Sequence, residues 1–487
     1  MTRRQLLTSL SAATLATGQT PRRPNILFVI ADDWSHGHAG AYGCTWIQTP
    51  NFDRVAREGA LFHNCFTSNP KCSPCRASIL TGRNTWQLKE AINHYSIFPN
   101  EFPVYPDLLE QSGYTVGLTG KGWGPGDYRS TGWKRNPAGT EFQQKKLKPP
   151  YSGISNNDYA GNFAAFLDQR DKAKPFCFWL GGQEPHRVYE EGSGLRAGRN
   201  PAGVNVPPYL PDHRIVRSDM LDYALEVEWF DQHLGLALKK LEETGELDNT
   251  LVVVTSDHGQ PFPRVKGQIY EHGFHIPLAV RWGKNIPAGR VVNDFINVRD
   301  FAPTFLEAAG VKSVPSITGR SFVNVLKGAT DPTRNVHLVG KERHDIGRPN
   351  DAGYPARAIR TPEYLYVRNY APDTWPAGNP ETGYRNVDDS PTKTFVISTF
   401  DEYYRLSFGF RAGEELYDMK ADPACMKNLA KEPAHAQTKR QLRERMEEML
   451  RAEGDPRMLG RADFFDTIQY TGPNKHSWDA WIKSQGR

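Results

Sequence analysis

The chain has 487 residues, of which 38% are hydrophobic and 24% are charged. This is the composition of a soluble globular protein long enough for two or three domains, and it holds no apolar stretch of the roughly 20 residues that a membrane-spanning helix needs. The formal net charge is only +5, and the lysines and arginines are scattered. The sequence therefore argues against nucleic-acid binding and against membrane insertion.

The first twenty residues predict an export signal. Arg3 and Arg4 precede a short, mildly apolar run rich in Ala, Leu and Thr, which is followed by small residues. This order is typical of a bacterial twin-arginine signal peptide, cut between about Ala16 and Thr20. We therefore expect residues 1–20 to be removed and the mature protein to be periplasmic or secreted. The alternative is an unstructured cytoplasmic tail.

Four apolar runs of strand length are each followed by glycine or by polar and charged residues. They are PNILFVIADD from Pro24, TVGLTGKG from Thr115, PFCFWLGGQEPH from Pro175 and TLVVVTSDHG from Thr250. Such runs are typical of strands that are buried on both faces of a parallel sheet. Because ligands gather at the carboxyl ends of parallel strands, the polar residues after each run are candidates for a functional site.

Helices are predicted between these strands. One covers NFDRVARE, with Asn51 as its cap and Gly59 as its stop. A longer helix over residues 218–241 has apolar side chains at spacings of three and four, namely Tyr223, Val227, Phe230, Leu234, Leu238 and Leu241. Strands alternating with helices predict an α/β fold with a large, mostly parallel sheet.

The pattern changes after about residue 340. Residues 356–370 (ARAIRTPEYLYVRNY) predict two short strands around a Thr-Pro turn, and EELYDM from Glu414 predicts a third. Residues 438–452 predict an amphipathic, charged helix, and residues 377–394 are rich in turn-forming residues and predict a long loop. The sequence therefore predicts a smaller α+β region at the C-terminal end.

The stretch KCSPCRASILTGR, residues 71–83, contains two of the six cysteines. The cysteines are too sparse and irregular for a disulfide framework, and a zinc site would need a second pair of ligands at a similar spacing. Ser73 as a cap, Pro74 as the first helical residue and Gly82 as a stop predict a helix. Cys72 then lies just ahead of a helix N-terminus, where free N–H groups stabilise negative charge, and Arg76 is one turn further on. This indicates an activated sulfur, or a group derived from it, facing an anion; the alternative is a buried cysteine packed against the helix.

The string C-x-P-x-R-x-x-x-L-T-G-R resembles the type I sulfatase signature at every fixed position, which here are Cys72, Pro74, Arg76, Leu80, Thr81, Gly82 and Arg83. The resemblance runs from about Pro24 to the C-terminal helix. It implies an alkaline-phosphatase-like fold, in which helices sandwich the large sheet, with a sulfatase catalytic domain over residues 21–340 and a smaller domain over residues 341–487.

The same resemblance implies an unusual nucleophile. In type I sulfatases the signature cysteine is oxidised to formylglycine by a separate maturation enzyme, so Cys72 would be no thiol in the working protein. One hydroxyl of the formylglycine hydrate would attack sulfur, and the other would expel sulfate as the aldehyde re-forms. This divides one difficult displacement into two easier steps.

Acidic residues follow two of the predicted strands. Asp32 and Asp33 follow the first strand, and Asp257 and then His258 follow the fourth. Oxygen donors from neighbouring parallel strands predict a site for a hard cation. The resemblance assigns these four residues, with the modified Cys72, to one calcium ion (Ca2+) per subunit. His258 is a departure, because many sulfatases have Asn there and imidazole is a poor calcium ligand, so another divalent metal is an alternative.

The resemblance also assigns roles to three further residues. Lys121 and Lys266 match the lysines that hold the sulfate oxygens, and His186 matches the acid that protonates the leaving group. Arg76 would stabilise the anion beside Cys72. Trp123 stands where many sulfatases have a substrate-binding histidine; candidates to replace it are His94, His272 and His344.

The motifs GGQEPHR, PFPR, VPPYLPD and ITGRSF resemble most the N-sulfoglucosamine sulfohydrolases. We expect Glu184 and the cluster of Arg343, His344, Asp345 and Arg348 either to contact a sugar and its carboxylate neighbours or to form solvated surface or an interdomain ion pair. The sequence thus predicts hydrolysis of sulfate from a sulfated saccharide, N-linked as in heparin or heparan sulfate. Alternatives are O-sulfate ester hydrolysis, phosphonate or phosphodiester hydrolysis, and a catalytically inactive carbohydrate-binding protein.

Overall fold

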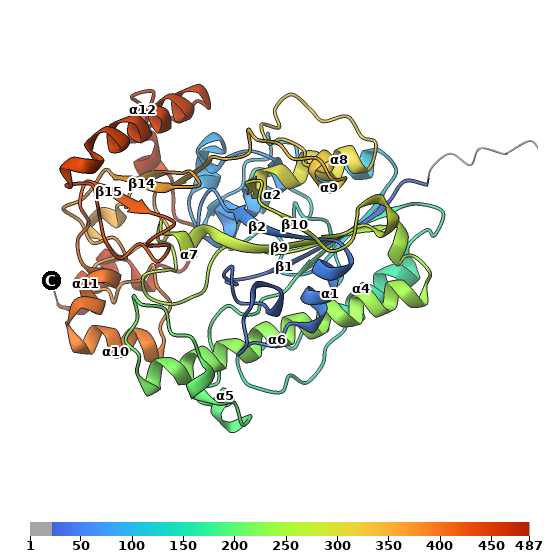
Figure 1. The fold of residues 1–487 in the computed structure, drawn as a ribbon, viewed down its shortest axis with the longest axis horizontal. Helices are drawn as coiled ribbons and strands as arrows, with labels where there is room; N and C mark the ends of the chain where they lie inside the picture. Colours follow the sequence, from blue (N-terminus) through green and yellow to red (C-terminus); the bar gives the residue numbers. More distant parts are fainter. Residues whose placement is uncertain (1–21, 487) are drawn as a thin grey trace, which may run out of the picture.

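The computed structural model describes residues 22–486, which form a large sheet, a small sheet and one isolated strand pair, with helices packed around them (Figure 1). The large sheet has nine strands in the order β10-β2-β9-β8-β1-β7-β4-β6, with β11 paired to β2. Their bounds are β1 (Asn25–Ala31), β2 (Ala60–Phe66), β4 (Thr115–Gly120), β6 (Thr140–Glu141), β7 (Phe176–Gly181), β8 (Thr250–Ser256), β9 (His275–Arg281), β10 (Arg290–Val292) and β11 (Ile296–Asn297).

The four strands predicted from the sequence are neighbours in this sheet. β1 pairs in parallel with β7 and β8, and β4 pairs in parallel with β7. Only β9 runs against its partners, β2 and β8. The mostly parallel sheet is therefore confirmed, and it brings the carboxyl ends of β1, β4, β7 and β8 to one edge.

Helices cover both faces of the large sheet (Figure 1). Leu27 and Val29 of β1 pack with α1 (Pro50–Glu58), α4 (Tyr159–Gln169) and α6 (Arg214–Glu243). Ile26 and Phe28 pack on the other side with α2 (Cys72–Thr81), α3 (Tyr105–Gln111), α8 (Phe301–Ala308) and α9 (Val323–Leu326). Burial on both faces explains why the β1 sequence is continuously apolar.

The predicted helices exist, but two predicted caps are wrong. α1 begins at Pro50, and the Asn51 side chain instead donates a hydrogen bond of 2.9 Å to Asp231 of α6. α2 begins at Cys72, because the amide of Cys75 already donates to the carbonyl of Lys71 at 3.0 Å. Ser73 therefore lies inside the first turn. Gly82 ends α2 with a φ of +65°, as predicted.

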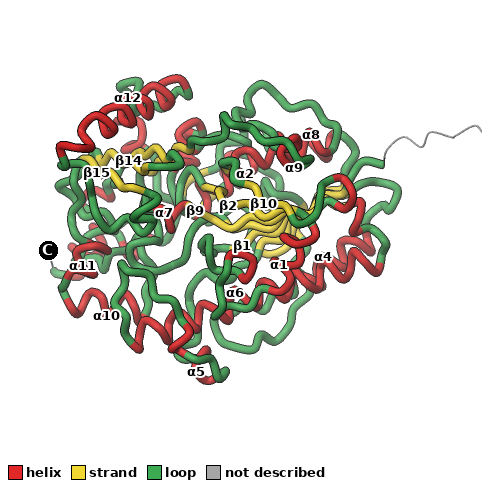
Figure 2. The backbone as a smooth tube through the Cα atoms, in the orientation of Figure 1, coloured by secondary structure: helices red, strands yellow, loops and turns green. Residues whose placement is uncertain are grey.

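The small sheet is antiparallel, in the order β12 (His337–Lys341), β13 (Ala356–Arg360), β14 (Tyr364–Asn369) and β15 (Glu414–Asp418). The three predicted strands correspond to β13, β14 and β15, and α12 (Ala436–Ala452) packs on β13 and β14 (Figure 2). β12 was not predicted, and it spans the expected division between residues 340 and 341.

The segment predicted as a loop over residues 377–394 is shorter in the structure. Ser390 accepts a hydrogen bond from the amide of Lys393 and caps α10 (Pro391–Thr399), whose first residue is proline. The other helices are α5 (Ser193–Arg196), α7 (Glu271–Phe274), α11 (Glu402–Phe408) and α13 (Trp478–Ser484), and the short strands β3 (Ser96–Ile97) and β5 (Gly126–Asp127) pair with each other.

Within residues 22–486, no helix is long and apolar enough to cross a membrane. The predicted export signal, residues 1–20, lies outside the described part of the chain.

A bidentate ion pair joins the two sheets: Arg360 of β13 donates to both carboxylate oxygens of Glu271 in α7, at 2.9 and 3.0 Å.

Candidate active site

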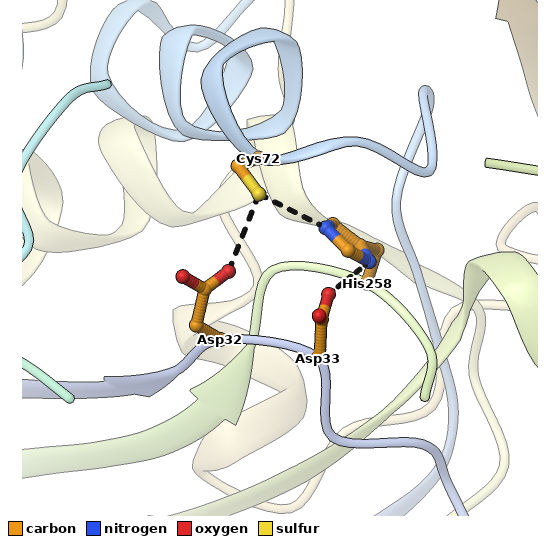
Figure 3. Close-up of side chains that lie close together, drawn as sticks. All are labelled: Asp32, Asp33, Cys72 and His258. Atoms are coloured by element: carbon orange, nitrogen blue, oxygen red, sulfur yellow. Dashed lines mark hydrogen bonds and ion pairs between the residues drawn. The ribbon is translucent and has the colours of Figure 1, made fainter. Parts of the chain in front are cut away.

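The sequence-predicted site residues meet at the carboxyl edge of the large sheet. Asp32 and Asp33 follow β1, Lys121 follows β4, His186 lies beyond β7, and Asp257 and His258 follow β8. The first turn of α2 brings Cys72 over this edge. Figure 3 shows Asp32, Asp33, Cys72 and His258 pointing toward one another, and all four are buried.

The sulfur of Cys72 lies between a carboxylate and an imidazole. Cys72 Sγ is 3.3 Å from Asp32 Oδ1 and 3.4 Å from His258 Nε2. Burial and the charge of Asp32 raise the pKa of the Cys72 thiol, but Lys121 and Lys266 outweigh them and hold this pKa well below its usual range. An anion at this position is therefore stabilised, as the sequence predicted.

One ligand atom from each of Asp32, Asp33, Cys72 and His258 lies within 4.8 Å of the others. Asp33 has a φ of +78°, a conformation that a non-glycine residue adopts at some cost and that is common at functional sites. Asp257 lies next to this group, with Oδ1 at 3.7 Å from His258 Nε2. The carboxylates are the oxygen donors that a hard cation binds, whereas the imidazole of His258 is not a usual calcium ligand.

Each carboxylate also has a cationic partner. Arg76 Nε donates to Asp257 Oδ2 at 2.9 Å, Lys266 Nζ donates to Asp33 Oδ1 at 2.6 Å, and Lys121 Nζ donates to Asp32. Burial would raise the pKa of Asp33, yet Lys266 and His258 lower it to about 2. Burial, together with the charge of Asp32, instead raises the pKa of Asp257 to about 6.

His186 stands at the mouth of this group. Its Nδ1 is 2.5 Å from the carbonyl oxygen of Arg187, so Nδ1 carries a proton and Nε2 faces the site, 4.0 Å from Asp33 Oδ2. The loop is anchored because Arg187 forms a bidentate ion pair with the buried Asp219, at 2.7 and 2.8 Å. The His186 side chain is 32% exposed, which leaves Nε2 open to a substrate.

A cavity of about 700 Å³ opens over Cys72, and both parts of the chain line it. The large-sheet side contributes Asp32, Lys121 and His186. The C-terminal side contributes Asp345, Arg385, Asp388, Asp389, Tyr470, Lys475 and His476. Of this second set, only Asp345 was considered from the sequence.

Comparisons with known proteins agree with the motif. Residues 24–311 match the Sulfatase family, and residues 264–376 match the family of the C-terminal part of N-sulphoglucosamine sulphohydrolase. The chain belongs to the sulfatase family.

Curated relatives of this sulfatase differ in specificity. The chain is 28% identical to N-sulphoglucosamine sulphohydrolase of Homo sapiens, covering 89% of this chain and 91% of the relative. It is 26% identical to N-acetylglucosamine-6-O-sulfatase of Bacteroides thetaiotaomicron, covering 91% and 90%. A structure solved in complex with its substrate D-glucosamine-2-N,6-O-disulfate has the same fold, with a TM-score of 0.66, 23% identity and coverage of 89% and 99%. The sulfatase fold expected from the sequence is thus confirmed, and so is membership of a family that hydrolyses sulfuric esters.

Trp123 of this sulfatase is a core residue. Its ring is buried and stacks on Phe98 at 5.0 Å. Of the three histidines considered as replacements, only His94 lines the cavity, where its Nδ1 is 2.7 Å from Asp345 Oδ1. His272 and His344 are instead hydrogen-bonded within the fold, to Tyr209 and Asn69 respectively.

The acidic and basic residues predicted as sugar contacts differ in whether they line the cavity and in whether they already have partners within the fold. Glu184 lines the cavity, but its two oxygens accept hydrogen bonds of 2.8 Å from the Ser155 amide and the Tyr159 hydroxyl, so it supports the loop that carries His186. Arg348 donates to backbone carbonyls. Asp345 is the member of its cluster that lines the cavity, and Lys71 Nζ approaches its Oδ2 at 2.8 Å.

Proposed function

We propose that this sulfatase removes the N-linked sulfate of N-sulfoglucosamine units, as in heparin or heparan sulfate. The observation that carries the proposal is the cavity itself. Its floor holds Cys72 with buried carboxylates and lysines, and its far wall comes from the C-terminal part of the chain. That part begins within the match to the C-terminal family of N-sulphoglucosamine sulphohydrolase. The alternative is an O-sulfate ester of another glycan, which the match to an N-acetylglucosamine-6-O-sulfatase favours.

The proposal includes formylglycine at position 72 and one calcium ion. Asp32, Asp33 and Asp257 would hold calcium through their carboxylate oxygens, together with the group at position 72 and His258. When bound, calcium supplies positive charge beside the sulfate, and formylglycine supplies a hydroxyl nucleophile in its hydrated form. The clustered, buried carboxylates fit such an ion.

The remaining side chains then have separable tasks. Arg76, fixed to Asp257, keeps a positive charge beside position 72. Lys121 and Lys266 would bind the sulfate oxygens, on which negative charge increases during transfer. His186 Nε2 donates a proton to the departing nitrogen or oxygen. We further propose that residues 1–20 direct export and that a maturation enzyme of the host oxidises Cys72.

The test is a product assay on protein co-expressed with a formylglycine-generating enzyme and supplied with calcium. N-sulfoglucosamine, 6-O-sulfated N-acetylglucosamine and a phosphate diester are offered in parallel. The proposal expects free sulfate and a new primary amine from the first substrate. Sulfate from the second alone would move the specificity to O-esters, and turnover of the diester alone would overturn the sulfatase assignment.

A further inference from the structure

Asp388 is an acidic residue in the cavity that the proposed chemistry does not use. It belongs to the segment between β14 and α10 and lines the cavity from the C-terminal side. Its carboxylate lies within 4.8 Å of ligand atoms of both Asp33 and His186. Asp388 Oδ2 is 3.3 Å from Lys266 Nζ, and among residues 22–486 this oxygen has no hydrogen-bond partner.

Asp388 shares its nearest cation with another carboxylate. Lys121 pairs with Asp32, Arg76 with Asp257 and Lys71 with Asp345. Lys266 already donates to both oxygens of Asp33, at 2.6 and 2.5 Å, so it offers Asp388 only a longer contact. A carboxylate without a full partner is unfavourable in a pocket that receives an anionic sulfate, unless the substrate also brings a hydrogen-bond donor or a positive charge.

The two kinds of sulfate differ in this respect at the atom bonded to sulfur. The bridging nitrogen of an N-sulfate carries a hydrogen, whereas the bridging oxygen of an O-sulfate ester carries none. When the S–N bond breaks, its electron pair stays on nitrogen and accepts the proton that His186 donates. The product is a primary amine, which becomes an ammonium group on taking a further proton from water. An O-sulfate leaves a neutral hydroxyl.

We infer that Asp388 is a specificity-determining residue that accepts a hydrogen bond from the leaving nitrogen and stabilises the amine product. Its position beside His186 puts the acceptor next to the proton donor, so both act on one leaving atom. The inference rests on the proposed function, because it needs an N-linked sulfate. It adds a specific reason why this pocket favours that substrate over an ester.

An aspartate far from the cavity provides a matched control. Asp248, which precedes β8 at the opposite end of that strand from Asp257, has the same charge, and its side chain is 78% exposed and ion-paired with Arg281 at 2.7 Å. Asp388→Asn and Asp248→Asn therefore remove the same charge, one beside the leaving group and one at the surface. Both variants are made in the full chain, co-matured as above.

The experiment compares three substrates for each variant: N-sulfoglucosamine, 6-O-sulfated N-acetylglucosamine and 4-nitrophenyl sulfate, whose phenolate leaves without a proton. For Asp388→Asn we expect kcat/KM on the N-sulfate to fall by about 30-fold or more, as for loss of one hydrogen bond to a charged group, and turnover of the esters to fall less than about threefold or to rise. Asp248→Asn changes all three by less than about threefold.

Product inhibition gives a second readout that does not need ester turnover. Glucosamine carries the ammonium group, while N-acetylglucosamine has the same ring and no charge there. In the wild type, glucosamine is expected to inhibit more strongly than N-acetylglucosamine. Asp388→Asn raises the inhibition constant for glucosamine by about tenfold and leaves those for N-acetylglucosamine and inorganic sulfate unchanged.

Equal losses on all substrates, with unchanged glucosamine inhibition, would overturn the inference and show that Asp388 acts only by orienting Lys266. That result differs from failure of the proposed function, in which the wild type itself releases no amine from N-sulfoglucosamine. If the wild type releases no amine, the inhibition constants still test Asp388. Its role is overturned as well if glucosamine and N-acetylglucosamine inhibit equally and Asp388→Asn changes neither inhibition constant.

Discussion

Two buried arginines show how the two regions of the molecule differ. Arg357 in β13 has every guanidinium nitrogen hydrogen-bonded: Asp455 accepts bonds of 2.6 and 3.0 Å, and two backbone carbonyls accept the others. Arg76 in α2 is equally buried, but its Nη2 has no hydrogen-bond partner within residues 22–486 and lies 3.8 Å from Asp32 Oδ1. The saturated arginine belongs to the structure, and the unsaturated one belongs to the reaction site.

The same contrast holds for the carboxylates. Glu271 and Asp455 bind guanidinium groups through both oxygens and are closed to solvent. Asp388, in contrast, has an oxygen with no hydrogen-bond partner among the residues that the structure describes. Incomplete pairing therefore distinguishes Arg76 and Asp388, at the carboxyl edge of the large sheet, from Arg357, Glu271 and Asp455.

The largest effect is expected at the nucleophile. Cys72→Ala removes the only side chain that the maturation enzyme can oxidise there, so sulfate release should fall by about 10³-fold or more. Cys75→Ala is the control, because burial raises the pKa of Cys75 and its thiol takes no part in the proposed chemistry. Sulfate release from an N-sulfoglucosamine substrate measures both. Full activity of the Cys72 variant would contradict the mechanism.

Replacing each of the two arginines by methionine separates an effect on the reaction from an effect on stability. Arg76→Met should lower kcat by about 10²-fold or more, since a positive charge beside the transferred group is lost. Arg357→Met should instead reduce the free energy of unfolding by about 3–5 kcal/mol, because the buried carboxylate of Asp455 loses its guanidinium partner.

Urea unfolding and kcat per folded molecule are the two measurements for this pair. In Arg76→Met the Asp257 carboxylate still accepts hydrogen bonds from the backbone amides of Asp33 and His258, at 3.2 and 2.9 Å. We therefore expect Arg76→Met to be less destabilised than Arg357→Met. Similar effects of both substitutions on both quantities would remove the distinction between the regions.

Removal of calcium by a chelator tests the proposed metal site. A calcium chelator should abolish turnover, and added calcium should restore it and raise the melting temperature. Calcium at about 100 times its dissociation constant contributes about 2.7 kcal/mol. His258→Asn should bind calcium more tightly, since an amide oxygen replaces an imidazole. Weaker calcium binding by this variant, measured by titration calorimetry, would contradict this prediction and show that the imidazole of His258 contributes to calcium binding.

The smallest effect is expected at the ion pair between the sheets. Burial would raise the pKa of Glu271, but Arg360 and His275 lower it from 4.5 to about 2. A depressed carboxyl pKa adds stability that is fully present above the unfolded value of 4.5 and is lost as the pH falls from there toward about 2.

Glu271→Gln should therefore cost about 2–3 kcal/mol at pH 7 and progressively less below pH 4.5. Urea unfolding of wild type and variant at a series of pH values measures this difference. A cost that does not change with pH would mean that the charge of Glu271 contributes nothing.

Much of the site could be predicted because its residues lie in short, local patterns. Asp32, Asp33 and Asp257 follow continuous apolar runs, and Cys72 opens a helix that ends at Gly82. Strand ends in a parallel sheet converge whatever the loops between them do, so these side chains could be brought together from the sequence. The caps were less predictable: Asn51 bonds to Asp231, 180 positions away in the chain.

The sequence by itself therefore determined the parallel sheet, its helices, the nucleophile position and the acidic residues around it. Only the tertiary structure decided the cavity wall. Asp388 and Asp389 are adjacent and chemically alike, and both line the cavity, yet the carboxylate of Asp388 reaches Lys266, whereas that of Asp389 is largely exposed and pairs with Arg385. No local pattern distinguishes them, because the direction of each side chain depends on how the segment before α10 packs against Lys266 and the large sheet.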